Sequence, residues 1–161
     1  MSTYLEFRDL DKLADDIREN RQRLWHGGAP GLSVDDFILP ANETGAPSMG
    51  DVSRDLGFSR VVSRLDRAYF TTDRQLGLAL ASGYGRRTGA TGRGTLYAVT
   101  LDPEVALEPD DDFPLGPDAC FQSPRARIVQ VTTQLLDPQD RKLGNYMQRF
   151  IDEADRRGSG L

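Results

Sequence analysis

The only histidine of the chain, His26, stands in RLWHGG at residues 23–28, directly before Gly27 and Gly28. A neutral imidazole can donate one hydrogen bond and accept another. Glycine has no side chain, so a neighbouring group can approach its backbone closely. The stretch predicts either a ligand-binding edge at the end of a short strand or a histidine that merely closes a core strand.

Two further stretches carry residues suited to chemistry. Tyr69 lies in AYFTTD at residues 68–73, where a predicted strand leads into a predicted helix. Thr71 and Thr72 offer hydroxyl groups there, and a helix N-terminus suits an anion. Carboxylates cluster in EPDDD at residues 108–112. Each stretch also has a structural interpretation, namely a core tyrosine and a solvated acidic loop.

Several classes of site are excluded by motif. The chain has no G-x-S-x-G sequence, so a serine-hydrolase elbow is not expected. RTGATGRG at residues 87–94 lacks the G-K-[ST] ending of a phosphate-binding loop and is interpreted as a flexible linker. A lone Cys120 and a single histidine argue against a disulfide and an ordinary zinc site. We therefore expect no metal.

Length and charge set the broad class. At 161 residues the chain is expected to form one domain, residues 1–161. The formal net charge of −5 disfavours a general nucleic-acid binder, although it allows a local basic groove. No signal sequence or membrane-length apolar run is expected, which makes the cytoplasm the default location.

Periodicity predicts helices and strands that do not alternate regularly, which favours an α+β fold. Thr72, three residues before Gln75, has the spacing of a capping box at the start of the middle helix. Residues 41–60 are polar and are expected to form a surface loop. The predicted helices cover residues 9–21, about 73–85 and 138–157. The predicted strands cover residues 23–28, 94–101, 105–108 and 125–133, and residues 64–73 are predicted to start as a strand and to become helical.

In this order the motifs resemble the small bacterial ADP-ribosyltransferases related to the rifamycin-inactivating enzyme. The stretches that carry the resemblance are LWHGGAPGLSVDDFILP, RAYFTTD, GTLYAVTLDPEVALEPD and SPRARIVQVTT, within residues 23–133. That family combines a histidine–glycine pair, a tyrosine and a downstream acid, an H-Y-[DE] arrangement. The resemblance implies two small antiparallel sheets around an NAD cleft, with flanking helices.

The resemblance also implies residue roles. His26 would hold a ribose hydroxyl, Gly27 and Gly28 would let the backbone meet the carboxamide, and Tyr69 would stack on the nicotinamide. Thr71 and Thr72 would add hydroxyl groups near the cofactor. Glu108 is the favoured acid, with Asp110 in reserve, because either carboxylate would stabilise positive charge on the sugar. Arg64 or Arg67 would meet the pyrophosphate or would form surface ion pairs.

The implied activity is NAD-dependent mono-ADP-ribosyl transfer, with NAD as co-substrate. The acceptor would be a small molecule such as a rifamycin, or a protein, as for a toxin or effector. RNA 2′-phosphotransfer on the same fold would need more arginine and histidine than can be placed. Two alternatives stay open: a non-catalytic module that holds NAD or ADP-ribose, and an interaction domain that docks a partner through its C-terminal helix.

Overall fold

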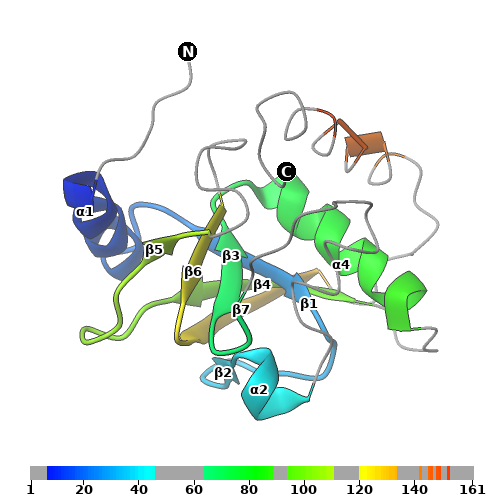
Figure 1. Cartoon of the computed structure of the whole chain (residues 1–161), viewed down its shortest axis with the longest axis horizontal. Helices are drawn as coiled ribbons and strands as arrows, with labels where there is room; N and C mark the ends of the chain where they lie inside the picture. The colour runs from blue at the N-terminus through cyan, green and yellow to red at the C-terminus, as the bar shows by residue number, and fades with distance from the viewer. Residues whose placement is uncertain are drawn as a thin grey trace.

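A single antiparallel sheet forms the centre of the fold (Figure 1). The computed structural model describes residues 7–45, 64–88, 94–110 and 120–133, with residues 142, 145–146, 148–149 and 152. The seven strands follow the order β2-β7-β4-β1-β3-β6-β5. They are β1 (Leu24–Gly28), β2 (Phe37–Ile38), β3 (Ala68–Thr71), β4 (Thr95–Thr100), β5 (Glu108–Pro109), β6 (Cys120–Ser123) and β7 (Ala126–Thr133).

The helices are α1 (Phe7–Arg18), α2 (Ala41–Thr44) and α4 (Arg74–Thr88), so the predicted α+β class is confirmed. The predicted boundaries of α1 are corrected at both ends. The helix ends before residue 21 because Asn20 adopts a left-handed conformation with φ 61°, which cannot continue a helix. Helix α4 runs on to Thr88, into the predicted linker, whose residues 89–93 lie outside the described part.

Other predicted segments are described only in part. Residues 142, 145–146, 148–149 and 152 are helical, and the rest of the helix predicted over 138–157 lies outside the described residues. Of the predicted loop 41–60, residues 41–44 form α2, and residues 46–60 are not described. Among the described residues, no helix has both the length and the apolar character that a bilayer span requires.

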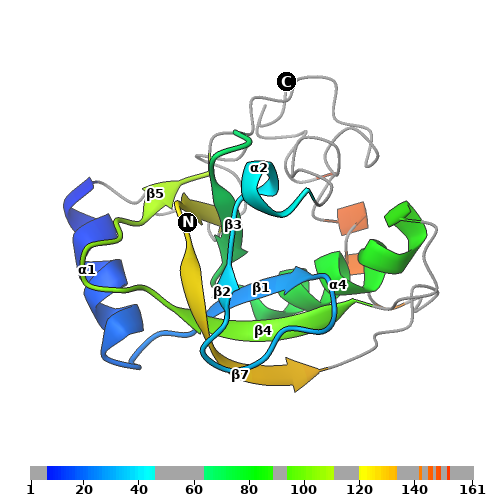
Figure 2. The ribbon, with the colours of Figure 1, turned by 90° about the horizontal axis from the view of Figure 1, so that it is seen from below.

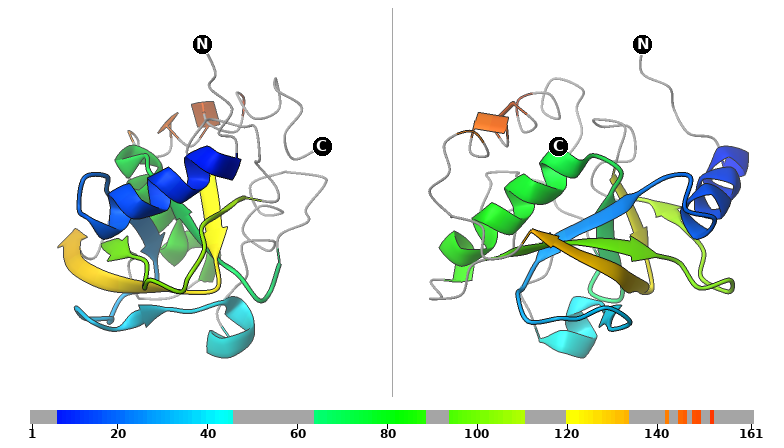
Figure 3. Two further views of the ribbon diagram at one scale, coloured as in Figure 1. Left: turned by 90° about the vertical axis from the view of Figure 1, so that its left-hand side faces the viewer. Right: turned by 180° about the vertical axis from the view of Figure 1, so that it is seen from behind.

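Alternating side chains of β1 give the sheet two different packing faces. Leu24 joins the main core with Ile17 of α1 and with Tyr97 and Val99 of β4. Trp25 points to the other face, where it packs with Leu96 and Ala98 beneath α4. Figure 2 and Figure 3 show α1 and α4 as separate layers on either side of the strands. His26 therefore belongs to the face of Leu24, opposite the face that α4 covers.

Strands β1 and β3 share the fewest paired residues of any two neighbouring strands in the sheet. Their pairing is confined to Trp25↔Thr71, whereas β1 and β4 pair over their whole length, from Leu24↔Val99 to Gly28↔Thr95. Beyond this junction β3 and β6 are steeply inclined to β1 and β4 (Figure 1). The expected two separate sheets are not confirmed, since all described strands belong to one hydrogen-bonded sheet.

Helix α4 is capped by Asp73 and not by the predicted Thr72. The Asp73 Oδ1 atom accepts the backbone N–H groups of Gln75 at 2.9 Å and Leu76 at 3.3 Å. The helix begins at Arg74, one residue later than the capping box at Thr72 required, so that prediction is wrong. The Asp73 carboxylate satisfies N–H groups that have no partner inside the helix.

Replacing Asp73 with alanine should lower the free energy of unfolding by about 1 kcal/mol, because two helix-end N–H groups lose their acceptor. Urea unfolding measures this change. Thr72→Ala is the matched control and should cost less than about 0.5 kcal/mol. Equal losses in the two variants would contradict the cap assignment.

Candidate functional site

The first glycine after His26 is required by helix packing. A Cβ atom on Gly27 would lie 2.1 Å from the carbonyl oxygen of Gly77 and 2.7 Å from the backbone nitrogen of Ala81, both in α4. Any larger residue at position 27 would push α4 off the sheet. The absence of a side chain is therefore used to seat α4, whereas the sequence predicted close approach of a ligand.

The second glycine makes room for the histidine ring. A Cβ atom on Gly28 would lie 2.7 Å from Nε2 of His26, so the imidazole lies directly against the backbone of Gly28. His26 and Gly28 are two residues apart on a strand and therefore share one face. Packing therefore explains why both residues after His26 in RLWHGG are glycine, with one contact on each face of β1.

The His26 ring spans the junction between β1 and β3. Its Nδ1 atom lies 2.9 Å from the carbonyl oxygen of Tyr69. A carbonyl oxygen can only accept, so Nδ1 carries the proton and Nε2 of the neutral ring is an acceptor. No described residue donates to Nε2. Burial lowers the pKa of His26, against the opposing effect of the Tyr69 carbonyl, and so favours the neutral ring.

This single histidine makes the stability of the protein depend on pH in a defined window. Its folded pKa lies below the ordinary value of 6.5, so the unfolded chain binds the proton more readily. The free energy of unfolding should therefore fall as pH drops below about 6.5 towards the folded pKa, before any carboxylate titrates.

Urea unfolding at pH 7.5 and pH 5.5 measures this dependence. His26→Asn removes the titrating group and should flatten the change between the two pH values. An equal loss of stability in the variant and the wild-type chain would contradict the assignment, because the chain has no other histidine.

Tyr69 is held at both its backbone and its hydroxyl group. Its carbonyl accepts from His26, and its hydroxyl accepts the backbone N–H of Arg64 at 2.6 Å. The side chain is 7% exposed, which leaves little of the ring open for stacking on a ligand. Tyr69 lies directly opposite Gln122 on β6.

Glu108 continues this row on the next strand. It pairs with Gln122, so Tyr69, Gln122 and Glu108 lie side by side across β3, β6 and β5. Arg67 Nε donates to Glu108 Oε1 at 2.8 Å, and Gln122 Nε2 donates to the same oxygen at 3.1 Å. Arg67 above all, then Gln122, lowers the pKa of Glu108, so the carboxylate is ionised at neutral pH.

The sequence did not identify Arg67 and Gln122 as the residues that orient Glu108. The sequence predicts that Arg67 meets the pyrophosphate or forms a surface ion pair, and in the structure Arg67 forms an ion pair with Glu108. Gln122 lies in β6, a strand that the sequence did not predict, so no local signal identified it. Tyr97 was also missed: it pairs with His26 across the sheet, and its hydroxyl donates to the carbonyl of Ala29 at 2.6 Å.

The other residues predicted for the site are not gathered around an open cleft. The guanidinium of Arg64 forms a fork with Asp66, at 2.8 and 2.7 Å. Thr71 is buried, and its hydroxyl accepts the backbone N–H of Asp73, whereas Thr72 is partly exposed. Asp110 is 4% exposed, while the side chain of Glu108 is 34% exposed. Of the two predicted acids, Glu108 is the one that solvent reaches.

Within the described part of the chain, no group of three or more histidine, cysteine or acidic side chains is arranged to hold a metal ion. A groove of about 500 Å³ lies at the end of α1 and is lined by Arg18, Arg23, Leu101 and Arg127 among others. It includes none of His26, Tyr69 and Glu108. Tyr69, Gln122 and Glu108 share the sheet face of Trp25 and Thr71, whereas His26 points to the opposite face, beside Phe70. The candidate site therefore has two parts that meet at the β1–β3 junction, where His26 Nδ1 contacts the carbonyl oxygen of Tyr69.

Comparison with known proteins adds no relative. No protein-family model matches the chain, and no curated protein matches its sequence. A relation to the ADP-ribosyltransferases therefore stays a prediction from the sequence motifs that contain His26, Tyr69 and Glu108.

Proposed function

We propose that this chain is an NAD-dependent mono-ADP-ribosyltransferase whose site lies at the β1–β3 junction, with His26 on one face of the sheet and Glu108 on the other. The observation that carries the proposal is the His26 imidazole at the β1–β3 junction. Its Nδ1 is fixed by Tyr69, and its Nε2 is left as an acceptor against the bare backbone of Gly28. A neutral acceptor in such a place suits a ribose hydroxyl.

The reaction needs negative charge near the sugar. When the bond between nicotinamide and ribose breaks, its electron pair leaves with the nicotinamide and the ribose carbon becomes positive. Glu108 supplies a fixed, ionised carboxylate, oriented by Arg67 and Gln122. A nucleophile of the acceptor then bonds to the ribose carbon and releases its proton, which completes transfer of ADP-ribose.

His26 and Glu108 divide the work in this scheme. His26 would fix the orientation of the ribose, because a hydrogen bond to Nε2 defines one face of the sugar. Glu108 would stabilise the positive charge that exists only in the transition state, which raises the rate rather than the affinity. The acceptor is either a rifamycin-like small molecule or a protein, as for a cytoplasmic toxin or effector.

One observation favours a second candidate, a non-catalytic module that only holds NAD or ADP-ribose. Arg67 pairs directly with Glu108 and offsets its negative charge. In a binding module this ion pair would stay closed, whereas in an enzyme the sugar must approach the carboxylate beside Arg67. Turnover of NAD separates the two.

The test is to mix the purified protein with NAD, with and without rifampicin, and to follow nicotinamide and the drug by mass spectrometry. Nicotinamide release only with the drug, and a drug mass raised by one ADP-ribose, would establish antibiotic modification. Release without the drug supports a transferase with another acceptor. Binding without release supports the binding module, and neither binding nor release would overturn both.

A further inference from the structure

A group of cations without carboxylate partners gathers at the start of α4. Most described lysine and arginine side chains form ion pairs: Lys12, Arg18, Arg21, Arg64, Arg67, Arg125 and Arg127 each lie within 4.0 Å of an aspartate or glutamate oxygen. Arg23, Arg74, Lys142 and Arg149 are exposed and form no such pair with any described residue. These four side chains are therefore the described cations whose charge could be used to bind an anion.

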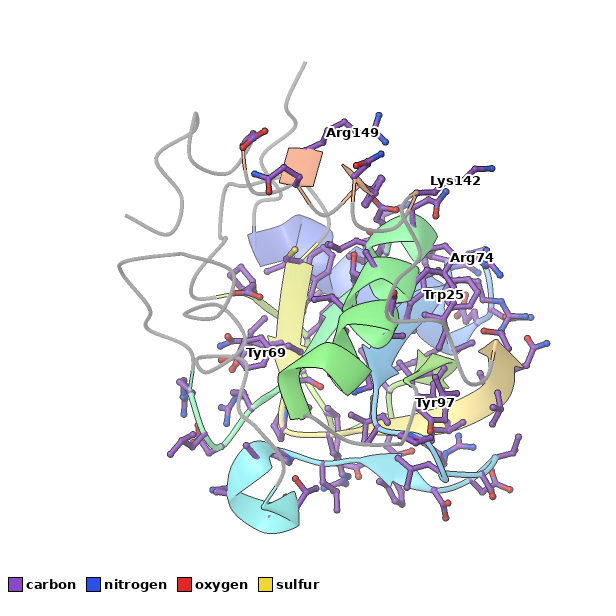
Figure 4. The ribbon with its side chains drawn as sticks, turned by 90° about the vertical axis from the view of Figure 1, so that its right-hand side faces the viewer. Trp25, Tyr69, Arg74, Tyr97, Lys142 and Arg149 are labelled. Carbon is purple, nitrogen blue, oxygen red and sulfur yellow. The ribbon has the colours of Figure 1, made fainter. Side chains whose placement is uncertain are left out.

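Arg74, Lys142 and Arg149 lie on one side of the molecule, and we call them the α4-start patch (Figure 4). Arg74 stands over the ring of Trp25 at 5.7 Å, and Arg149 stands over the ring of Tyr146 at 5.8 Å. An aromatic ring beneath a guanidinium fixes its plane and leaves its N–H edge free for a partner.

The contact between Tyr146 and Asp73 joins the two halves of the patch. The Tyr146 hydroxyl donates to Asp73 Oδ2, which connects the C-terminal helical residues to the start of α4. Burial, and then Asp73, raises the pKa of Tyr146, so its hydroxyl stays a donor at neutral pH. Both carboxylate oxygens of Asp73, the acid nearest Arg74 in sequence, accept hydrogen bonds from neutral groups: Oδ1 caps α4, and Oδ2 accepts from Tyr146.

We propose that the α4-start patch binds the phosphate backbone of a single-stranded nucleic acid. The cations come from two separate elements and lie on either side of the Tyr146–Asp73 contact, which suits a linear chain of charges better than one small anion. Arginine forks and lysine are the side chains that contact phosphate most effectively. A flexible strand can follow such an irregular surface, whereas a duplex requires an element shaped to its groove.

An acidic protein fits the surface less well. Protein interfaces need an apolar centre as well as charge. The exposed large apolar side chains of the described residues lie in segments away from α4, at Val34, Phe37, Leu39 and Leu65. The net charge of −5 repels a polyanion at long range, so binding should be weak, and added salt should weaken it further because cations compete for the phosphates.

Fluorescence anisotropy of a labelled single-stranded RNA 20-mer, titrated with the protein in the absence of NAD, tests this proposal. The triple variant Arg74→Gln, Lys142→Gln, Arg149→Gln should weaken binding at least about 10-fold at low salt. The control Lys12→Gln, Arg21→Gln, Arg125→Gln removes the same charge from ion-paired positions and should change affinity less than about 3-fold. Both variants should melt within about 4 °C of the wild type.

The salt dependence of the affinity provides a second test. Three phosphate contacts predict a slope of about −2 for log K against log salt in the wild type, and the patch variant should lose most of it. No binding of the strand at low salt would overturn the proposal, and so would equal weakening by both triple variants. Equal affinity for a polyglutamate peptide of the same length would overturn it in favour of an acidic protein. Since no NAD is present, the result is independent of the proposed transfer reaction.

Discussion

Replacing Glu108 with glutamine should slow nicotinamide release from NAD about 100-fold. The amide keeps the size of the side chain but carries no negative charge, so positive charge on the ribose loses its stabilisation. NAD binding should change much less, because the charge that Glu108 offsets arises only in the transition state. Nicotinamide formed per unit time, measured by mass spectrometry at saturating NAD, gives the rate.

Glu104→Gln is the matched control for this substitution. Glu104 is an exposed acid that pairs with Arg125 on the surface, so its loss should leave the rate within about 2-fold. A wild-type rate in Glu108→Gln, together with a lost rate in Asp110→Asn, would move the acid to Asp110. Wild-type rates in both variants would contradict the site.

Replacing Gly27 with alanine should lower the free energy of unfolding by about 3 kcal/mol, a large share of the total for a domain of this size. The added methyl group would meet backbone atoms of Gly77 and Ala81, which cannot swing aside as a side chain can. Relief requires α4 to move away from β1, which opens the contact between Trp25 and the helix.

Gly45→Ala provides the comparison, and urea unfolding measures both variants. Gly45 has open space around its Cβ position but a left-handed φ of 70°, so alanine should cost only about 1 kcal/mol there. The order of the two losses distinguishes steric conflict from backbone strain. A Gly27→Ala protein as stable as the wild type would show that α4 does not seat on β1 in solution.

Local sequence signals predicted the elements with strong periodicity. Strands β1, β4 and β7 fall within the predicted ranges. β-Branched and apolar residues dominate β4 and β7, whereas β1 was predicted from a short apolar run before two glycines. The short strands β2 and β6 were missed, since two to four residues carry no readable alternation. Their pairing partners come from distant parts of the chain, and that information is absent from any local window.

The sequence predicted which residues belong to the candidate site but not which of them contact one another. His26, Tyr69 and Glu108 stand in ordered motifs, but only the sheet register brings Gln122 between Tyr69 and Glu108. Likewise, the sequence flagged both glycines after His26 without distinguishing their causes. Gly27 serves the helix on one face and Gly28 the imidazole on the other, a difference that depends on packing from residues 50 positions away.

Nitrogen-15 NMR of the protein labelled at histidine tests the central claim most directly, because the chain has one histidine and yields one ring. At pH 7.5 the free protein should show a neutral ring with its proton on Nδ1. Added NAD should shift the Nε2 resonance while Nδ1 keeps its bond to Tyr69, both in the wild type and in Glu108→Gln, where turnover is slow. A ring already charged at pH 7.5, or ring resonances that do not move with NAD up to about 1 mM, would contradict the account.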